Sequence, residues 1–173
     1  YIVQPVCERE SHDKICRFPG QIESDMVSIN MVRYFLYKWW SMKYSSESRI
    51  LLSDFRDVFF QQNPFSFRRR DWQDHQLIIF LEHHPTKVIQ RCPFNNGWIE
   101  NCYGTAAIDM IGTNTPSCSG VTFGTRDAIL AYTYLMLEQL DPNIRSQYLE
   151  SPPVYKENPR ACISLGMDQG FHN

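Results

Sequence analysis

The chain has 173 residues, of which 43% are hydrophobic and 14% aromatic, and it carries a formal charge of −2 at pH 7. The length suits one packed domain, and the hydrophobic content excludes a disordered chain. The nearly balanced charge gives no reason to expect nucleic acid as a partner, and no apolar run is long enough to span a bilayer.

The first part of the chain divides into an irregular leader and a helix. Residues 1–23 mix proline, glycine, cysteine and charged residues, which predicts irregular structure after a short strand. Ser24 or Asp25 can cap a helix. Apolar residues then recur at helical spacing as far as about Tyr44, which predicts a helix that packs on the core.

The two ends of the chain resemble cuts within a longer protein. The chain opens on Tyr1, without the charged and then apolar pattern of a signal peptide. It closes in residues 168–173, which read as the first turn of a helix. We therefore expect a fragment, with a single partial domain over 1–173 and its core over 24–173.

Three segments further along have the composition of strands. The first two are short apolar runs, which are typical of buried parallel strands, and the third ends at a glycine. These strands are predicted at residues 50–52, 77–81 and 119–124. Thr125 can cap a helix over 128–140, and a shorter helix is predicted over 143–150. Glycine, asparagine, cysteine and threonine predict mostly loop over 92–120.

The most informative segment is Ser53-Asp54-Phe55-Arg56-Asp57, directly after the first predicted strand. Ligand sites of open α/β sheets lie at the carboxyl ends of the strands. Two carboxylates there suit a hard divalent cation whose remaining ligands are substrate phosphates. The alternative is a surface turn in which Asp54 caps the backbone and Arg56 pairs with Asp57.

This segment resembles the acidic signature of GT-A glycosyltransferases, in which a helix leads to an apolar strand that ends in Asp-x-Asp. Here two residues, and not one, separate Asp54 from Asp57. The resemblance implies that Asp57 binds the metal and that Asp54 faces both the metal and the nucleotide ribose. It also leaves Arg56 free to contact a phosphate of the donor.

Two later segments resemble the same family in the expected order. Cys118-Ser119-Gly120-Val121 is similar to the Asn-Ser-Gly start of the family's strand beside the donor sugar, with cysteine in place of asparagine. The resemblance implies that Ser119 and Gly120 shape the sugar pocket. Asp168-Gln169 is similar to the acidic pair that reaches the transferred sugar or the acceptor, and it implies a catalytic role. The resemblance also implies that His172 is a further metal or phosphate ligand. The alternatives are an ordinary helix cap for Asp168 and a plain surface residue for His172.

The resemblance implies a GT-A-like α/β/α sandwich with a mostly parallel central sheet, truncated at both ends. It implies transfer of a sugar from a nucleotide diphosphate donor to a hydroxyl of a glycan or glycoprotein, assisted by Mn²⁺ or Mg²⁺. Two other classes stay open: a non-catalytic binding domain of the same kind, and a metal-dependent phosphohydrolase or nucleotidyltransferase.

Cysteine usage and the aromatic residues add two expectations. The six cysteines fit disulfides in an oxidising compartment, so with the family resemblance we expect the full-length protein in the secretory pathway, in the Golgi lumen. The alternative is six free or buried thiols in a cytosolic protein. Trp39-Trp40 and Tyr34-Tyr37 offer a carbohydrate platform, but core packing is the preferred interpretation of these residues.

Overall fold

The fold is taken from a computed structural model of the chain. The structure describes residues 6–10, 13–17, 27–54, 58–66, 76–82, 87–140 and 166–173. The predicted phosphate contact Arg56, the predicted metal ligand Asp57 and the predicted helix over 143–150 lie outside these residues.

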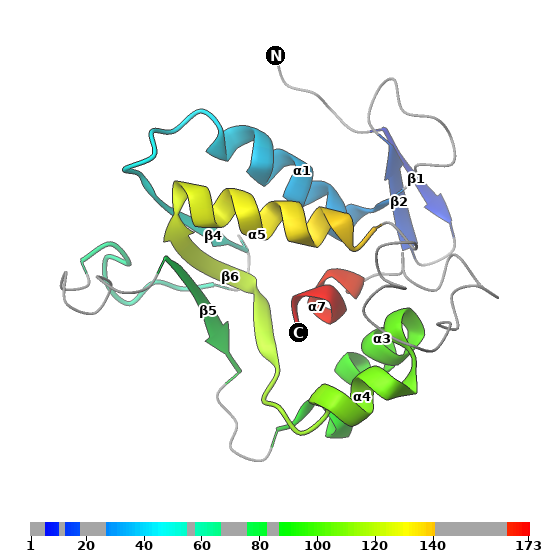
Figure 1. Cartoon of the computed structure of the whole chain (residues 1–173). Helices are drawn as coiled ribbons and strands as arrows, with labels where there is room; N and C mark the ends of the chain where they lie inside the picture. The colour runs from blue at the N-terminus through cyan, green and yellow to red at the C-terminus, as the bar shows by residue number, and fades with distance from the viewer. Residues whose placement is uncertain are drawn as a thin grey trace.

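A three-stranded sheet forms the centre of the described structure, with strand order β4-β6-β5 (Figure 1). β4 is Arg49–Ser53, β5 is Leu77–Leu81 and β6 is Ser117–Thr125. β6 lies between the other two and runs antiparallel to both. The three predicted strands are therefore present, each close to its expected position.

The expected mostly parallel central sheet is wrong, because every strand pair that the structure describes is antiparallel. The expectation rested on two apolar runs that were taken to be buried on both faces. In fact the edge strand β5 is exposed at the consecutive residues Ile79, Phe80 and Leu81, whereas strands of a parallel sheet are buried on both faces. The described structure thus does not fit a Rossmann-like sandwich.

Two helices, α1 and α5, lie side by side along one face of the sheet (Figure 1). α1 is Ile29–Ser41, and its first turn is capped by Ser28, whose hydroxyl accepts a hydrogen bond from the backbone of Asn30 at 3.2 Å. It is shorter than the helix predicted from Ser24 to Tyr44, since Val27–Ser28 forms the short strand β3. The predicted caps Ser24 and Asp25 and the observed cap Ser28 all offer a side-chain oxygen to the helix backbone.

α5 is Arg126–Glu138 and begins where the sequence predicted. Thr125 Oγ1 accepts a hydrogen bond from the backbone of Ala128 at 3.2 Å, which confirms the predicted cap. Together the two helices and β4 bury the main hydrophobic core: Met31, Val32, Tyr34, Leu52, Ile129, Tyr132 and Met136.

Helices also replace most of the loop that was expected over 92–120. α3 is Pro93–Tyr103 and α4 is Thr105–Ile111, preceded by the short 3₁₀ helix η2 at Ile89–Arg91. Proline at the first position of α3 costs no hydrogen bond, and Gly104, at φ 81°, separates the two helices. Pro93 and Gly104 could be recognised in the sequence as helix signals. The glycine and asparagine content of the segment nevertheless favoured the prediction of a loop.

The short helix α7, Met167–His172, lies between α5 and the pair α3 and α4 (Figure 1). It begins after Gly166, which has φ 85°, and a Cβ at that position would overlap the ring of Trp98. The predicted helix at the end of the chain is therefore present, and it contacts β6 directly.

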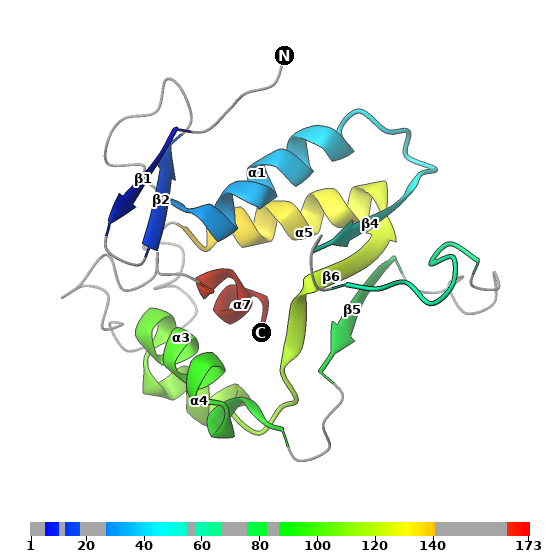
Figure 2. The same ribbon diagram turned by 180° about the vertical axis from the view of Figure 1, so that it is seen from behind.

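Within residues 1–23, expected to be irregular after a short strand, the structure describes two strands. β1, Val6–Glu10, and β2, Asp13–Arg17, form an antiparallel hairpin that pairs onward with β3. This small sheet lies at the start of α1, as Figure 2 shows from behind.

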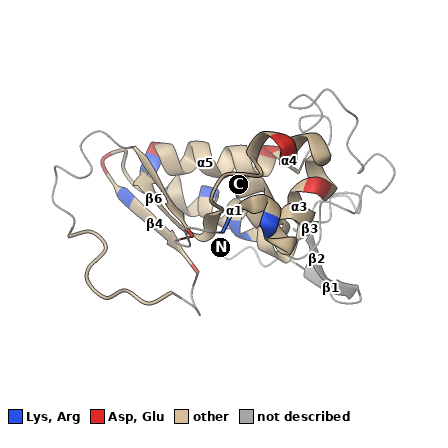
Figure 3. Ribbon diagram, turned by 90° about the horizontal axis from the view of Figure 1, so that it is seen from below, with Lys and Arg blue, Asp and Glu red and all other residues tan. Residues whose placement is uncertain are grey.

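The predicted core packing is confirmed for Tyr34 but is wrong for Trp39 and Trp40, whose exposed fractions are 40% and 46%. The Lys43 ammonium lies 3.5 Å from the centroid of the Trp39 ring, a cation–π contact at the end of α1. Both signs of charge are distributed among the described elements (Figure 3). Within the described part of the chain, no helix has the length and apolar character needed to cross a membrane.

Candidate functional site

The centre of the candidate site is an arginine between two carboxylates. Arg33 projects from α1 and reaches Asp54, the residue after β4, with 2.5 Å between Nη1 and Oδ1. Its Nη2 pairs with Oδ2 of Asp168 in the first turn of α7. The exposed fractions of the side chains are 23% for Arg33, 36% for Asp54 and 2% for Asp168. One ion pair is therefore half-exposed and the other is buried.

The groups around Arg33 keep its guanidinium positively charged. Burial alone would lower the pKa of the guanidinium, but the Asp168 carboxylate and the neighbouring groups outweigh burial and raise that pKa above its ordinary value. The guanidinium also lies 5.6 Å from the centroid of the Tyr34 ring. Burial raises the pKa of Tyr34 well above its ordinary value, so this phenol stays neutral. The cation thus faces two carboxylates and a neutral ring.

β6 supplies the wall beside both carboxylates. The Ser119 hydroxyl donates to Oδ2 of Asp168 at 3.3 Å, and the backbone N–H of Asp54 donates to the carbonyl of Gly120 at 2.8 Å. A Cβ on Gly120 would lie 2.8 Å from Oδ2 of Asp54 and 3.5 Å from Sγ of Cys118. Glycine is therefore needed here to let the Asp54 carboxylate lie against the strand.

Amide side chains of α7 bind the backbone of β6. Gln169 Oε1 accepts from the N–H of Ser119 at 2.8 Å, and its Nε2 donates to the carbonyl of Ser117. Asn173 Oδ1 accepts from the N–H of Ser117 at 2.8 Å, and its Nδ2 donates to Asn95 on α3 at 2.8 Å. Both polar groups of the Gln169 amide are thus engaged, and they fix Asp168 relative to the sheet.

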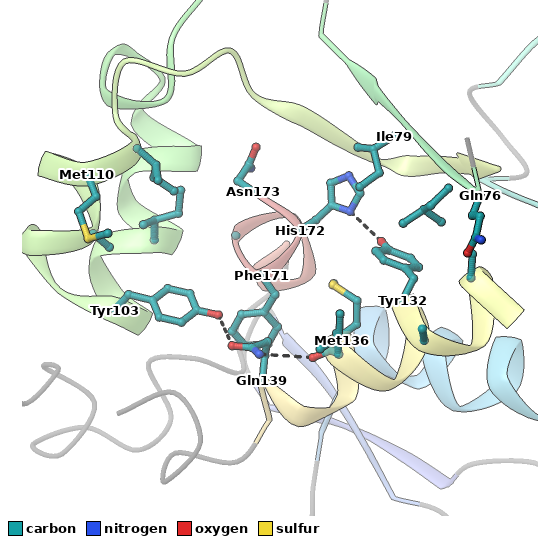
Figure 4. Close-up of a pocket in the computed structure, with 18 residues that line it drawn as sticks. Gln76, Ile79, Tyr103, Met110, Tyr132, Met136, Gln139, Phe171, His172 and Asn173 are labelled. Atoms are coloured by element: carbon teal, nitrogen blue, oxygen red, sulfur yellow. Dashed lines mark hydrogen bonds between the residues drawn. The ribbon is translucent and has the colours of Figure 1, made fainter. Parts of the chain in front are cut away.

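His172 is directed away from this network. Its Nδ1 lies 2.7 Å from the hydroxyl of Tyr132 on α5 (Figure 4). Burial lowers the pKa of His172 to about 4, so the imidazole is neutral at pH 7. Its Nε2 is buried and has no hydrogen-bond partner in the described part of the chain. Among those residues no group of three or more His, Cys, Asp or Glu is arranged to hold a metal, and the metal role of His172 stays a prediction.

An apolar pocket of about 720 Å³ lies on the other side of α7. Residues of β5, α3, α4, α5 and α7 line it, among them Ile79, Met110, Tyr132 and Phe171 (Figure 4). Its polar groups include the Tyr103 hydroxyl, which donates to Oε1 of Gln139 at 2.7 Å. The pocket is therefore chemically distinct from the charged site around Arg33.

The structure brings five predicted site residues together from three separate parts of the chain: Asp54, Ser119, Gly120, Asp168 and Gln169. Arg33, the cation that joins the two carboxylates, was not predicted from the sequence. The only available signal was its position, because it follows the buried Met31 and Val32 and precedes the buried Tyr34. A charged residue flanked by core residues in this way needs a buried or half-buried partner.

The chemistry of Asp54 fits one part of a divalent-cation site. Its carboxylate is half-exposed, and its Oδ2 lies in the space that the absent Gly120 side chain leaves open. Mg²⁺ is commonly held by one or two carboxylates together with substrate phosphates, so Asp54 could supply one ligand of such a site, and the metal site stays a prediction.

Comparisons with protein-family models, with curated proteins and with solved structures find no match for this chain. No family membership follows from them. The functional proposal therefore rests on the contacts of the site and on the resemblance of its three sequence segments.

Proposed function

We propose that this protein is a metal-dependent glycosyltransferase, which moves a sugar from a nucleotide diphosphate donor to a hydroxyl of a glycan or glycoprotein. One observation carries the proposal. The three segments that resemble donor-site motifs contribute Asp54, Ser119, Gly120 and Asp168 to one charged, hydrogen-bonded cluster. Segments so distant in the sequence have no local reason to meet.

In this proposal the cation is Mn²⁺ or Mg²⁺, and Asp54 holds it together with Asp57. When bound, the cation neutralises the diphosphate as the sugar leaves it. Asp54 meets the requirements for such a role because it follows a strand end, is half-exposed and leaves Oδ2 free of Arg33. The absence of a side chain on Gly120 leaves the space that this oxygen occupies.

Asp168 would orient a hydroxyl of the donor sugar or of the acceptor. Its carboxylate is nearly fully buried and is held by Arg33 and Ser119, so its direction is fixed before any ligand arrives. Pre-positioned groups of this kind lower the cost of reaching the transition state. The predicted catalytic role of Gln169 becomes a positioning role, since its amide is engaged with β6.

The compartment is part of the proposal. Cys102 is disulfide-bonded, which supports an oxidising compartment such as the secretory pathway, and the Golgi lumen is proposed from the family resemblance alone. Cys92 and Cys118 are free cysteines. A disulfide and free thiols together are compatible with an oxidising compartment.

A second candidate is a non-catalytic domain that binds the same donor. The arrangement of Arg33 favours it, because the guanidinium neutralises both carboxylates that catalysis would use. In that case nucleotide binding would not require a metal. A phosphohydrolase or nucleotidyltransferase would instead release phosphate or pyrophosphate.

The proposal is tested by thermal unfolding of the full chain with UDP-, GDP- and CMP-sugars, each with and without Mn²⁺. A ligand at 100 times its dissociation constant adds about 2.7 kcal/mol of stability. We expect one nucleotide class to stabilise the chain only with Mn²⁺, and Asp54→Asn to abolish this effect. Asp127→Asn is the matched control, because Asp127 is an exposed carboxylate paired with Arg126 at the start of α5.

Two results would decide against the proposal. Stabilisation by a nucleotide sugar without Mn²⁺, equal in Asp54→Asn, would favour the non-catalytic domain. Release of phosphate or pyrophosphate, measured with a coupled assay, would favour the hydrolytic or nucleotidyl-transfer class over sugar transfer.

A further inference from the structure

We propose that the apolar pocket beside α7 binds an uncharged, largely apolar small molecule whose polar group is a hydrogen-bond acceptor, such as a ketone carbonyl. Apolar contacts with the lining hold the body of this ligand, and the Nε2–H of His172 donates to its acceptor. The inference goes beyond the proposed sugar transfer and does not depend on it, because the pocket and the charged site around Arg33 lie on opposite sides of α7.

The size of the pocket is that of a ligand site. Its volume is about 720 Å³. Protein interiors are close-packed and contain few voids larger than a water molecule, so a space of this size is not a packing gap. Sites for small molecules typically enclose about 300–1,000 Å³ and combine an apolar lining with a few polar groups. The pocket fits that description.

The lining selects against a charged ligand. Among the described residues that line the pocket, none is Asp, Glu, Lys or Arg. Large apolar side chains at the pocket are exposed, by 39% at Ile79, 72% at Met110 and 53% at Leu135. Exposed apolar patches of this kind mark binding sites. A charged molecule would lose its hydration here without gaining an ion pair, so we infer an uncharged ligand.

His172 provides a buried polar atom that lacks a partner. Its exposed fraction is 9%, and its ring lies between Tyr132 and Ile79, which also line the pocket (Figure 4). Nδ1 lies 2.7 Å from the Tyr132 hydroxyl, whereas Nε2 is buried without a hydrogen-bond partner among the described residues. Leaving such an atom unsatisfied costs free energy. A ligand in the pocket would supply the missing partner.

The contact with Tyr132 determines which hydrogen-bonding role is left to Nε2. Burial lowers the pKa of His172 to about 4 and raises the pKa of Tyr132, so at pH 7 the imidazole is neutral and the phenol keeps its proton. An imidazole nitrogen is a better acceptor than a phenol oxygen, so the Tyr132 hydroxyl donates to Nδ1. The one hydrogen of the neutral ring is then on Nε2, which therefore donates. The ligand must carry an acceptor.

Other polar groups at the pocket already have partners within the protein. The Tyr103 hydroxyl donates to Oε1 of Gln139 at 2.7 Å, and Nε2 of Gln139 donates to the carbonyl of Leu135 at 3.4 Å. The amide of Asn173 is bound to α3 and β6. These contacts leave His172 as the group that would recognise the acceptor of a ligand.

The test is a fluorescence titration of the full chain with prodan, an uncharged naphthalene dye that carries one ketone. We expect prodan to bind, with a blue shift of its emission as the dye leaves water. The same dye without its propionyl group should bind about three- to tenfold more weakly, because it lacks the acceptor. The analogue with a carboxylate in place of the ketone should bind on the order of tenfold more weakly than prodan.

Two variants of His172 test the hydrogen bond. His172→Leu removes the donor and keeps the site apolar, so we expect the preference for prodan over the ketone-free dye to disappear. His172→Leu leaves the Tyr132 hydroxyl without this partner, and His172→Leu/Tyr132→Phe removes both groups in case the single variant does not fold. The ketone-free dye should bind to either variant as it binds to the wild type, which shows that the pocket itself is intact.

A substitution in α5 tests whether the dye occupies this pocket. Ala131 is exposed and lines the pocket, so Ala131→Trp fills part of the space and should weaken prodan binding on the order of tenfold. Tyr134→Trp is the matched control, because Tyr134 lies on the same helix, is 52% exposed and is not part of the lining. This variant should bind prodan like the wild type.

Three results would each overturn the inference. The first is a wild type that binds no prodan, and the second is Ala131→Trp binding it as tightly as Tyr134→Trp does. The third is a preference for prodan that is unchanged in the folded His172 variants, or a carboxylate analogue that binds as tightly as prodan. None of these measurements involves a nucleotide sugar or a metal, so their outcome is separate from that of the proposed function.

Discussion

Protonation of His172 should limit the stability of the protein in mild acid. The imidazole is buried, and its pKa falls from the ordinary value of 6.5 to about 4 in the folded chain. The unfolded chain therefore binds a proton at a higher pH than the folded chain does. The contribution of His172 to the free energy of unfolding is fully present above pH 6.5 and is lost as the pH is lowered from 6.5 to 4. The difference in pKa corresponds to a loss of roughly 3 kcal/mol across that window.

The assay is urea unfolding at several pH values between 7 and 4, with the wild type compared to His172→Gln. Glutamine retains a polar group that can reach the Tyr132 hydroxyl, but it does not titrate. Because every other acid and base is common to both proteins, the difference between their pH profiles reports His172 alone. We expect the wild type to lose more stability than the variant as the pH falls. Parallel profiles would refute the reasoning that burial of this imidazole holds its pKa low.

Two further predictions concern the contacts of β6. Gly120→Ala places a Cβ 2.8 Å from Oδ2 of Asp54. We expect this variant to have a lower melting temperature, to lose about 1–3 kcal/mol of unfolding free energy and to show no Mn²⁺-dependent stabilisation. Gly97→Ala is the control, because no atom lies near its Cβ position and the substitution should not destabilise the protein. A Gly120→Ala protein that behaves like the wild type would contradict the close approach of Asp54 to the strand. Gln169→Ala removes two hydrogen bonds to the β6 backbone and should cost about 1–3 kcal/mol, with faster hydrogen exchange at the Ser119 amide. Unchanged exchange there would show that α7 is held by other contacts.

The elements that the sequence predicted well are those with strong local signals. Thr125 precedes a helix-forming run and caps it, and the apolar runs at β4 and β5 are strands. Their direction in the sheet could not be read in the same way, because it depends on how the long connections return the chain. β6 enters between β4 and β5 after α3 and α4, which reverses its direction relative to both.

The missed helix α3 has a physical explanation as well. Its buried residues are Asn95, Ile99 and Cys102, at helical spacing, but only two of the three are apolar. Its glycine and paired asparagines favour turns in isolation. Packing of the helix against α7 supplies what local preference lacks, and this tertiary contribution is invisible in the composition.

The candidate site was predictable in part. Carboxylates at a strand end and at a helix start are recognisable, so Asp54 and Asp168 were found. Arg33 was not, since a single arginine within a helix has many ordinary explanations. Its role depends on two partners from distant segments, and only the folded chain brings them together.

The shortness of α7 has a consequence for how often the charged cluster is complete. A six-residue helix is not stable by itself, so α7 owes its order to hydrogen bonds and packing from α3 and β6. Local opening of such a segment needs less free energy than global unfolding. Each opening would carry Asp168 out of the cluster while the sheet and the two long helices persist. The free energy of that local opening, and not the global stability, sets the fraction of molecules in which the cluster is complete.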